Sequence, residues 1–373
     1  MIKKVVALSS SLILASSLFA KDIKIGVIMP LTGAIAGYGQ MTKKGIDLAN
    51  EMKPTLKNGE KIKLVYIDNA GDKAQSANAV NRAIDKEKVV AIIGALTSGN
   101  SLVVAPIVKK AHIPTVAPVA TNPRVTRANP YMNRACFIDP FQGKVAAKFA
   151  LNNLHAKTAV VVIDKSQPYS AGLAKEFMKA YTKKGGKILK KVFITSGDKD
   201  FKAVLSTIKS ANPDVVYAPI YAPEMALMLK QAKMLGIKKQ FLAGDGISDL
   251  KTLTSVAKDA SNGVMYSDHF NEAAAPTKLS KEFVIKYHSK YNNEAVPSFA
   301  ANGADSYFII VNAMNKCSNP KDKECIAKNI TKTKKLQGVT GYITIPKSGN
   351  PVKSAVINKV ENGQAKYEAT INP

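Results

Sequence analysis

The chain has 373 residues, which is long for one domain and predicts two. Apolar residues make up 46% of it, as in globular proteins, so a largely disordered chain is excluded. Lys and Arg number 54 against 27 Asp and Glu, which gives a net charge of +27. Because the basic residues are spread along the chain, with no arginine-rich arm or basic tail, the charge favours a solvated surface over a nucleic-acid or membrane-binding face.

The first twenty residues differ from the rest. Lys3 and Lys4 precede an apolar, serine-containing stretch, and Ala20 is a small residue before a polar one. This pattern predicts a secretory signal peptide over residues 1–20, cut near Ala20, and it is too short for a membrane span. The mature chain is therefore expected to be soluble and exported, with a net charge of 27 − 2 = +25.

Strands and helices are predicted to alternate through the first part of the chain. The strands cover residues 24–29, 61–68 and 89–93, and a further apolar strand ends at 119–121; the helices cover 40–52, 74–86 and 102–110. Strands that alternate with helices of this length indicate βαβ units and a parallel sheet.

The alternation starts again after Asp139. Helices are predicted over 141–152, 171–184 and 200–210 and between Pro223 and Gly236, with strands over 159–163, 188–193, 214–218 and 240–243. Helices over 278–291 and 301–315, a strand near 342–345 and a strand pair around 362–363 complete the chain. Two similar α/β halves place a cleft between two domains, and ligands bind at the carboxyl ends of such strands.

Nucleotide binding and catalysis find little support. Gly37-Tyr38-Gly39 begins a dinucleotide motif, but Thr42 replaces its third glycine, and no phosphate-binding G-x-x-x-x-G-K-S/T motif is present. No zinc-binding or nucleophile-elbow motif occurs. The four histidines, including His269, are far apart in sequence and are each interpreted as surface or packing residues. We therefore expect no enzyme activity, no metal and no cofactor.

Hydroxyl side chains follow two strands of the first half. Ser98 lies in the turn before a helix, and Thr121 follows the neighbouring strand. A helix N-terminus with such donors is suited to bind a carboxylate. The alternative is that both residues are ordinary turn or cap residues.

The second half offers a negatively charged side chain, in contrast to the hydrogen-bond donors of the first half. Asp245 stands between two glycines directly after a strand, where it can pair with a ligand ammonium or simply form an Asp-Gly turn. Tyr38, Tyr169 and Tyr221 also follow strands and are either cleft residues or ordinary core and surface residues. Together, a carboxylate site, an ammonium acceptor and aromatic walls are suited to a neutral, apolar amino acid.

Three cysteines are present. Cys317 and Cys325 enclose a nine-residue segment, and export to an oxidising compartment permits a disulfide between them. Cys136 stands in an apolar context and is expected to be a buried, inert thiol.

The order of these motifs resembles the periplasmic leucine/isoleucine/valine-binding protein family, the solute receptors of branched-chain amino-acid ABC importers. The likeness covers nearly the whole mature chain and weakens after about Ala274. The matching passages are 25–27, 30–33, 38–39, 93–98, 118–123, Asp139 with 142–143, Tyr169 with 172–174, 200–201, Tyr221 with 223–225, and 241–246.

The resemblance implies a role for each site residue. Ser98 and Thr121 would hold the ligand carboxylate, while the Val119 carbonyl, the Thr121 hydroxyl and Asp245 would hold the ammonium. The side-chain pocket would be walled by Tyr38, Ala120, Tyr169 and Tyr221. Many relatives carry Glu in place of Asp245, so the shorter side chain requires tighter closure or a bridging water.

The family fold is the type I periplasmic binding protein, two doubly wound α/β domains joined by three crossover strands with the ligand cleft between them. Domain 1 would comprise 21–139 and 269–346, and domain 2 would comprise 140–268 and 347–373. The expected protein is a periplasmic monomer that closes on its ligand and delivers it to a membrane permease. The alternatives are a receptor or sensor for another small amide or acid, such as urea or an aromatic acid, an exported enzyme, and a basic adhesive surface protein.

Overall fold

The structure, a computed structural model, describes residues 22–373, and the predicted signal peptide lies outside them. The strands are β1 (Ile23–Met29), β2 (Ile62–Asp68), β3 (Ala91–Gly94), β4 (Thr115–Ala117), β5 (Met132–Arg134), β6 (Thr158–Asp164), β7 (Lys187–Ile194), β8 (Val215–Tyr217), β9 (Gln240–Ala243), β10 (Met265–Asp268), β11 (Leu336–Gln337), β12 (Tyr342–Ile343), β13 (Ala355–Glu361) and β14 (Gln364–Ile371).

The helices lie mostly between consecutive strands. They are α1 (Ala36–Met52), α2 (Lys73–Asp85), α3 (Ser98–Lys110), α4 (Asp139–Asn152), α5 (Pro168–Lys183), α6 (Lys202–Ala211), α7 (Ala222–Met234), α8 (Leu250–Ala257), α9 (Lys278–Lys290), α10 (Ser298–Met314) and α11 (Lys323–Ile330), with 3₁₀ turns η1 (Pro123–Thr126), η2 (Asp245–Ile247), η3 (Lys258–Ser261) and η4 (Glu272–Ala274). No helix within residues 22–373 is both long and apolar enough to cross a bilayer.

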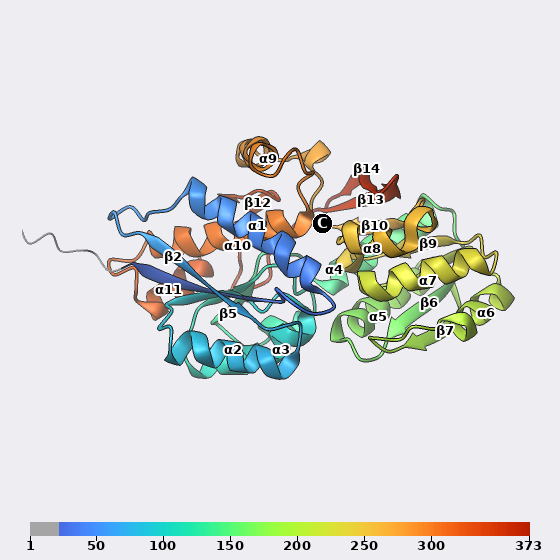
Figure 1. The fold of residues 1–373 in the computed structure, drawn as a ribbon, viewed down its shortest axis with the longest axis horizontal. Coiled ribbons are helices and arrows are strands. Elements are labelled where there is room, and N and C mark those ends of the chain that lie inside the picture. Colours follow the sequence, from blue (N-terminus) through green and yellow to red (C-terminus); the bar gives the residue numbers. More distant parts are fainter. Residues whose placement is uncertain (1–21) are drawn as a thin grey trace, which may run out of the picture.

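The first lobe is built on a five-stranded sheet in the order β2-β1-β3-β4-β5, with every pair parallel. Its central strand β3 is buried and apolar on both faces, as expected where helices cover both sides of a parallel sheet. Helices α1 and α10 pack together on one face, and α2 and α3 cover the other (Figure 1).

The second lobe has a seven-stranded sheet in the order β14-β13-β10-β9-β8-β6-β7. The strands from β10 to β7 run parallel, whereas β13 and β14 form an antiparallel hairpin that extends the sheet at one edge. Helices α4 and α5 lie on one face, and α6, α7 and α8 lie on the other.

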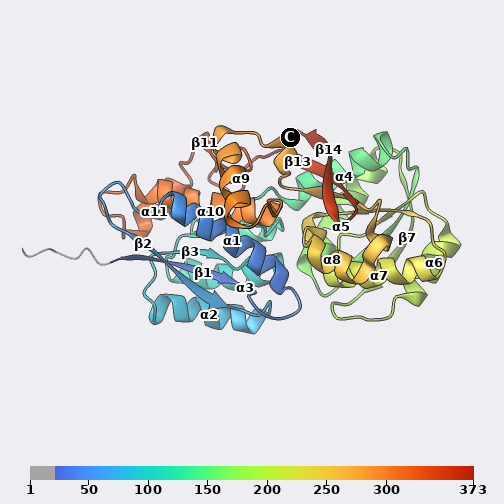
Figure 2. The ribbon, with the colours of Figure 1, turned by 45° about the horizontal axis from the view of Figure 1, so that its top comes forward.

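The chain passes between the two lobes three times. It crosses between β5 and α4, between β10 and α9, and between β12 and β13, so the two lobes stand side by side (Figure 2). These observations confirm the predicted fold class of two α/β domains with three crossings.

Several element bounds differ from those predicted. Helix α3 begins at Ser98 rather than Leu102, because the Thr97 side chain caps the helix by accepting from the Asn100 N–H at 3.5 Å. Strand β4 ends at Ala117, directly before Pro118, whose lack of an N–H disfavours further pairing. Helix α1 begins at Ala36 rather than Gln40, and the short helix α11 was not predicted.

Candidate functional site

The first wall of the cleft is the N-terminus of α3. Ser98 is the first residue of this helix and is buried, with 2% of its surface exposed. Its hydroxyl oxygen accepts from the Asn122 backbone N–H at 3.2 Å, which leaves the hydroxyl proton free to be donated. The first backbone N–H groups of a helix have no partner within the helix, so this end can bind a negative group.

The segment after β4 forms the adjoining part of this wall. Val119 lines the cavity between the lobes, whereas Ala120 and Thr121 are fully buried and are not among its lining residues. The Ala120 carbonyl accepts from the buried Arg134 guanidinium. The Thr121 hydroxyl makes no well-formed hydrogen bond with residues 22–373, and its weak contact with the Asp139 carboxyl lowers the pKa of that group.

Tyr38 joins the two lobes. It lies on α1 of the first lobe, and its hydroxyl accepts from the Ala222 N–H at 2.9 Å and donates to the Gly246 carbonyl at 2.5 Å, both in the second lobe. Burial raises the pKa of Tyr38 well above its usual value, so the hydroxyl stays protonated. Because these two hydrogen bonds span the cleft, the structure represents a closed arrangement of the lobes.

The aromatic wall consists of rings from both lobes. Tyr169 and Tyr221 stack with centroids 5.3 Å apart and planes inclined by 8°. Tyr38 meets Tyr221 edge-on at 5.7 Å, and Phe299 of α10 lies 5.3 Å from Tyr38. Sequence reasoning missed Phe299, because nothing in its local pattern distinguishes it from an ordinary core residue.

Asp245 is the acidic residue of the cleft and is 2% exposed. Its Oδ1 accepts from the Tyr169 hydroxyl at 2.9 Å and from the Gln142 amide at 2.9 Å. Its Oδ2 lies 3.0 Å from His269 Nε2. Two side-chain donors and the His269 ring therefore hold this carboxylate in place.

His269 is a packing residue, as predicted for a histidine, since its ring lies 4.1 Å from that of Phe137, but the prediction missed its contact with Asp245. Its side chain is completely buried and pairs with Asp245, because it follows β10 just as Asp245 follows the neighbouring strand β9. The rule that a polar residue after a parallel strand belongs to the cleft could have found His269. Gln142 lies near the start of α4, and no sequence pattern gave its side chain a role of its own.

The cavity between the lobes is small in this closed arrangement, about 10 Å³, which is close to the room that one water molecule needs. An amino acid therefore requires the lobes to open or the side chains to move. The lining side chains come from both lobes: Tyr38, Thr97, Ser98, Val119, Tyr169, Tyr221, Asp245, Gly246 and Phe299.

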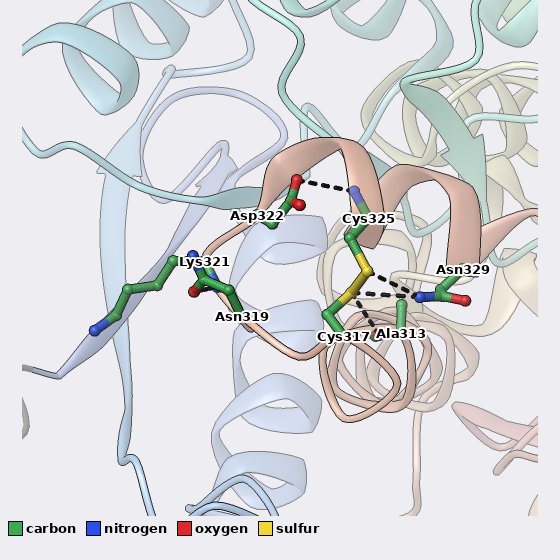
Figure 3. The surroundings of a disulfide bond; sticks show 7 residues. All are labelled: Ala313, Cys317, Asn319, Lys321, Asp322, Cys325 and Asn329. Carbon is green, nitrogen blue, oxygen red and sulfur yellow. Dashed lines mark hydrogen bonds between the residues drawn. A yellow bond between two sulfur atoms is a disulfide. The ribbon is translucent and has the colours of Figure 1, made fainter.

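The cysteines lie outside this cavity. Cys317 and Cys325 form a disulfide in the structure, with an S–S distance of 2.11 Å and Cα atoms 5.9 Å apart, and it connects the end of α10 to α11 (Figure 3). The Asn329 amide nitrogen lies 3.3 Å from both sulfur atoms. Cys136 is buried, and burial raises the pKa of its thiol to about 12, as befits an inert side chain.

Comparison with known proteins places the chain in a family. The family model described as "Periplasmic binding protein" matches residues 22–365. The chain is 30% identical over 334 residues to the Leu/Ile/Val-binding protein BraC3 of Rhizobium johnstonii, a match that covers 88% of this chain and 89% of that protein.

Solved structures agree with this match. The leucine-binding protein LivK of Thermotoga maritima superposes with a TM-score of 0.91 at 43% identity, covering 94% of this chain and 99% of that one. The branched-chain amino-acid binding protein LivJ of Streptococcus pneumoniae, solved with isoleucine, gives a TM-score of 0.88 at 30% identity, covering 95% and 100%. The chain thus belongs to the periplasmic binding protein family, whose members are substrate-binding proteins.

Proposed function

We propose that this protein is the periplasmic receptor of an ABC importer and that it binds leucine, isoleucine or valine. One observation carries the proposal: Ser98 of the first lobe and Asp245 of the second line the same cavity. The proposed carboxylate site and the proposed ammonium acceptor would then face each other, as the two charged groups of an amino acid require. The names of the relatives at 30% to 43% identity support the same ligand class.

The ligand carboxylate would lie at the N-terminus of α3. The Ser98 hydroxyl and the first N–H groups of the helix would donate to it, and the fully buried Thr121 hydroxyl would donate from the next segment. Such charge-assisted hydrogen bonds are stronger than those between neutral groups. The Val119 carbonyl would accept from the ligand ammonium.

The ligand side chain would lie among aromatic rings. Tyr38, Tyr169, Tyr221 and Phe299 supply this surface, with Ala120 behind it. Within the described residues, Asp245 is the one charged side chain that lines the cavity, and the ammonium would use it. A charged ligand side chain would then have no partner, so a neutral apolar side chain fits best.

Transport would proceed by hinge closure. We propose that an open form binds the amino acid on the first domain (21–139 and 269–346), and that the second domain (140–268 and 347–373) then closes over it. The closed monomer would be recognised by a permease in the inner membrane. Export would depend on the signal peptide at residues 1–20, cut near Ala20.

A thermal-shift panel tests the ligand class. The protein is unfolded and refolded to remove carried-over ligand, then heated with each neutral amino acid in turn. A ligand present at 100 times its Kd should stabilise the folded form by about 2.7 kcal/mol. The absence of a shift with leucine, isoleucine, valine and every other neutral amino acid would contradict the proposal.

Two analogues separate this function from that of a receptor for an acid or an amide. 4-Methylpentanoate keeps the leucine carboxylate and side chain but lacks the ammonium, and leucinamide lacks the carboxylate. Both should bind much more weakly than leucine, since each leaves one half of the cleft unpaired. Tighter binding of 4-methylpentanoate than of leucine would favour the acid receptor.

A further inference from the structure

His269 occupies a position that joins the hinge to the ligand cleft. It is the first residue after β10, at the second crossing between the lobes. Its ring packs 4.1 Å from Phe137, at the first crossing, and 6.4 Å from Phe299 of the first lobe. Its Nε2 faces Asp245 in the second lobe at 3.0 Å. The surroundings of this imidazole therefore depend on both lobes.

The hydrogen bonds of His269 indicate its tautomer in the closed arrangement. The side chain is fully buried, and Nδ1 has no hydrogen-bond partner among residues 22–373. A neutral ring with its proton on Nε2 can donate to Asp245. It leaves the Nδ1 lone pair without a donor, and this costs less free energy than a buried N–H group without an acceptor. A protonated ring would bury an N–H group without an acceptor, which costs free energy. The Asp245 carboxylate favours the protonated ring, whereas the missing acceptor at Nδ1 and a ligand ammonium bound to Asp245 both favour the neutral form.

Other ionisable groups surround the pair and must be counted. Asp268 accepts from the His269 backbone N–H at 2.7 Å, and burial raises its pKa to about 6. On α4, burial raises the pKa of Asp139 to about 7, and the nearby negative charge of Asp245 also raises it. Tyr169 donates to Asp245 from α5, and the Lys353 ammonium is buried at the third crossing, 3.6 Å from Asp305.

We propose that His269 is a positioning residue for the ligand ammonium and makes ligand affinity depend on pH. This inference rests on the proposed function. When neutral, His269 holds Oδ2 of Asp245 toward the cleft and leaves the negative charge for the ammonium. When protonated, it neutralises Asp245 itself and repels the ligand cation.

The sign of the effect follows from linkage. A ligand ammonium bound at Asp245 favours neutral His269, so binding releases a proton whenever the free protein carries one there. The affinity is then highest at pH 8 and falls on acidification, by up to tenfold for each pH unit where one full proton is displaced. The buried carboxyls of Asp139 and Asp268 could produce a slope of the same sign, because a nearby ligand cation also lowers their pKa.

The decisive variant is His269→Gln, because glutamine can still donate to Asp245 but does not titrate. Isothermal titration calorimetry with leucine from pH 8 to pH 5 should show the falling affinity in the wild type and a clearly shallower fall in this variant, in which only the slope due to Asp139 and Asp268 remains. His288→Gln is the matched control: His288 also faces a carboxylate, Glu272 at 3.0 Å, but lies outside the cavity. It should keep the wild-type slope.

A second measurement needs no variant. Repeating the wild-type titration in buffers of different ionisation enthalpy gives the number of protons released per ligand, which should rise toward one on acidification. No release, or a wild-type slope in His269→Gln, would overturn the inference while leaving the proposed function intact. If leucine, isoleucine and valine all fail to bind at every pH, the proposed function fails, and this inference fails with it.

Discussion

Two buried carboxylates in this protein are held in opposite ways. Asp305 on α10 accepts from the backbone N–H groups of Val339 at 2.5 Å and Thr340 at 3.1 Å, and lies 3.6 Å from the Lys353 ammonium. Asp245 receives no backbone hydrogen bond; its donors are two neutral side chains and a histidine. Both residues are almost completely shielded from solvent.

The difference separates a structural charge from a functional one. The Asp305 cluster connects α10 to the third crossing, since Lys353 also donates to the Ala135 carbonyl at 2.8 Å. Backbone donors and a lysine ammonium leave little for Asp305 to gain from a ligand. Asp245 lines the cleft, and its one ionisable donor is a histidine whose charge can change. The Asp305–Lys353 pair, which we call the fixed pair, stabilises the first lobe and the hinge. The Asp245–His269 pair, which we call the adjustable pair, is suited to ligand binding.

Breaking the fixed pair should have the largest effect. Lys353→Met leaves the Asp305 charge buried without its cation and should lower the free energy of unfolding by about 3–5 kcal/mol. Urea unfolding of the ligand-free protein measures this loss. The control is Lys366→Met, which removes an exposed ion pair with Glu361 at 3.1 Å and should cost at most about 1 kcal/mol. Similar losses in both variants would show that the Asp305 cluster is not a special structural contact.

Asp245→Asn should act on binding instead. The amide oxygen can still accept from Gln142 and Tyr169, so ligand-free stability should change by no more than about 1 kcal/mol. The loss of charge opposite a ligand ammonium should weaken leucine binding by about 2–5 kcal/mol, or about 30- to 5,000-fold in Kd. Asp305→Asn is the mirror-image control, with reduced stability and nearly unchanged Kd. Normal leucine affinity in Asp245→Asn would refute its assignment as the ammonium acceptor.

Asp139 extends the comparison to a carboxylate with weaker support. Within residues 22–373 it has no well-formed hydrogen bond and only a weak contact with the Thr121 hydroxyl, which lowers its pKa; burial outweighs this contact and raises the pKa to about 7. The folded protein thus binds this proton more tightly than the unfolded chain, whose aspartates titrate near ~4. This contribution to stability is present at low pH and is lost as the pH rises through about 7.

Asp139→Asn should remove that pH dependence. The stability of the variant minus that of the wild type should therefore increase from pH 5 to pH 8, by about 2–4 kcal/mol for a shift of this size. Urea midpoints at the two pH values test it, with the exposed Asp200→Asn as control. A constant difference would mean that Asp139 is ionised in the folded protein throughout this range.

The positions of Ser98 and Asp245 could be predicted because each follows a strand of a parallel sheet, and such ends meet at one edge. The aromatic wall was harder: Tyr38 lies inside α1, and only the approach of the two lobes brings its hydroxyl to Ala222 and Gly246. Phe299 belongs to a helix buried along almost its whole length, so no periodic pattern marks its one cleft-facing position.

The sequence did not reveal that His269 contacts Asp245, for a related reason. A lone histidine in a sequence is more often a surface or packing residue, and the pairing of His269 with Asp245 depends on the neighbouring register of β9 and β10. Thr97 likewise caps α3 through its side chain, which shifts Ser98 from a loop into the first helical turn. The His269 contact depends on geometry between segments and could not be supplied by local propensity, whereas the Thr97 cap is local and could have been recognised as an N-cap in the sequence.

Tyr38→Phe should have the smallest effect, and it tests whether ligand binding at Asp245 depends on closure of the two lobes. The hydroxyl makes two hydrogen bonds between the lobes, so its loss should weaken ligand binding by about 1–3 kcal/mol, or about 5- to 150-fold in Kd, while the stability of each lobe remains. Tyr307→Phe is the matched control, because its hydroxyl bonds Asn50 and the Lys53 carbonyl within the first lobe. It should lower stability and leave Kd unchanged. If the two variants changed Kd equally, the hydrogen bonds that Tyr38 makes between the lobes would contribute nothing specific to ligand binding. Binding at Asp245 would then not depend on these closure contacts.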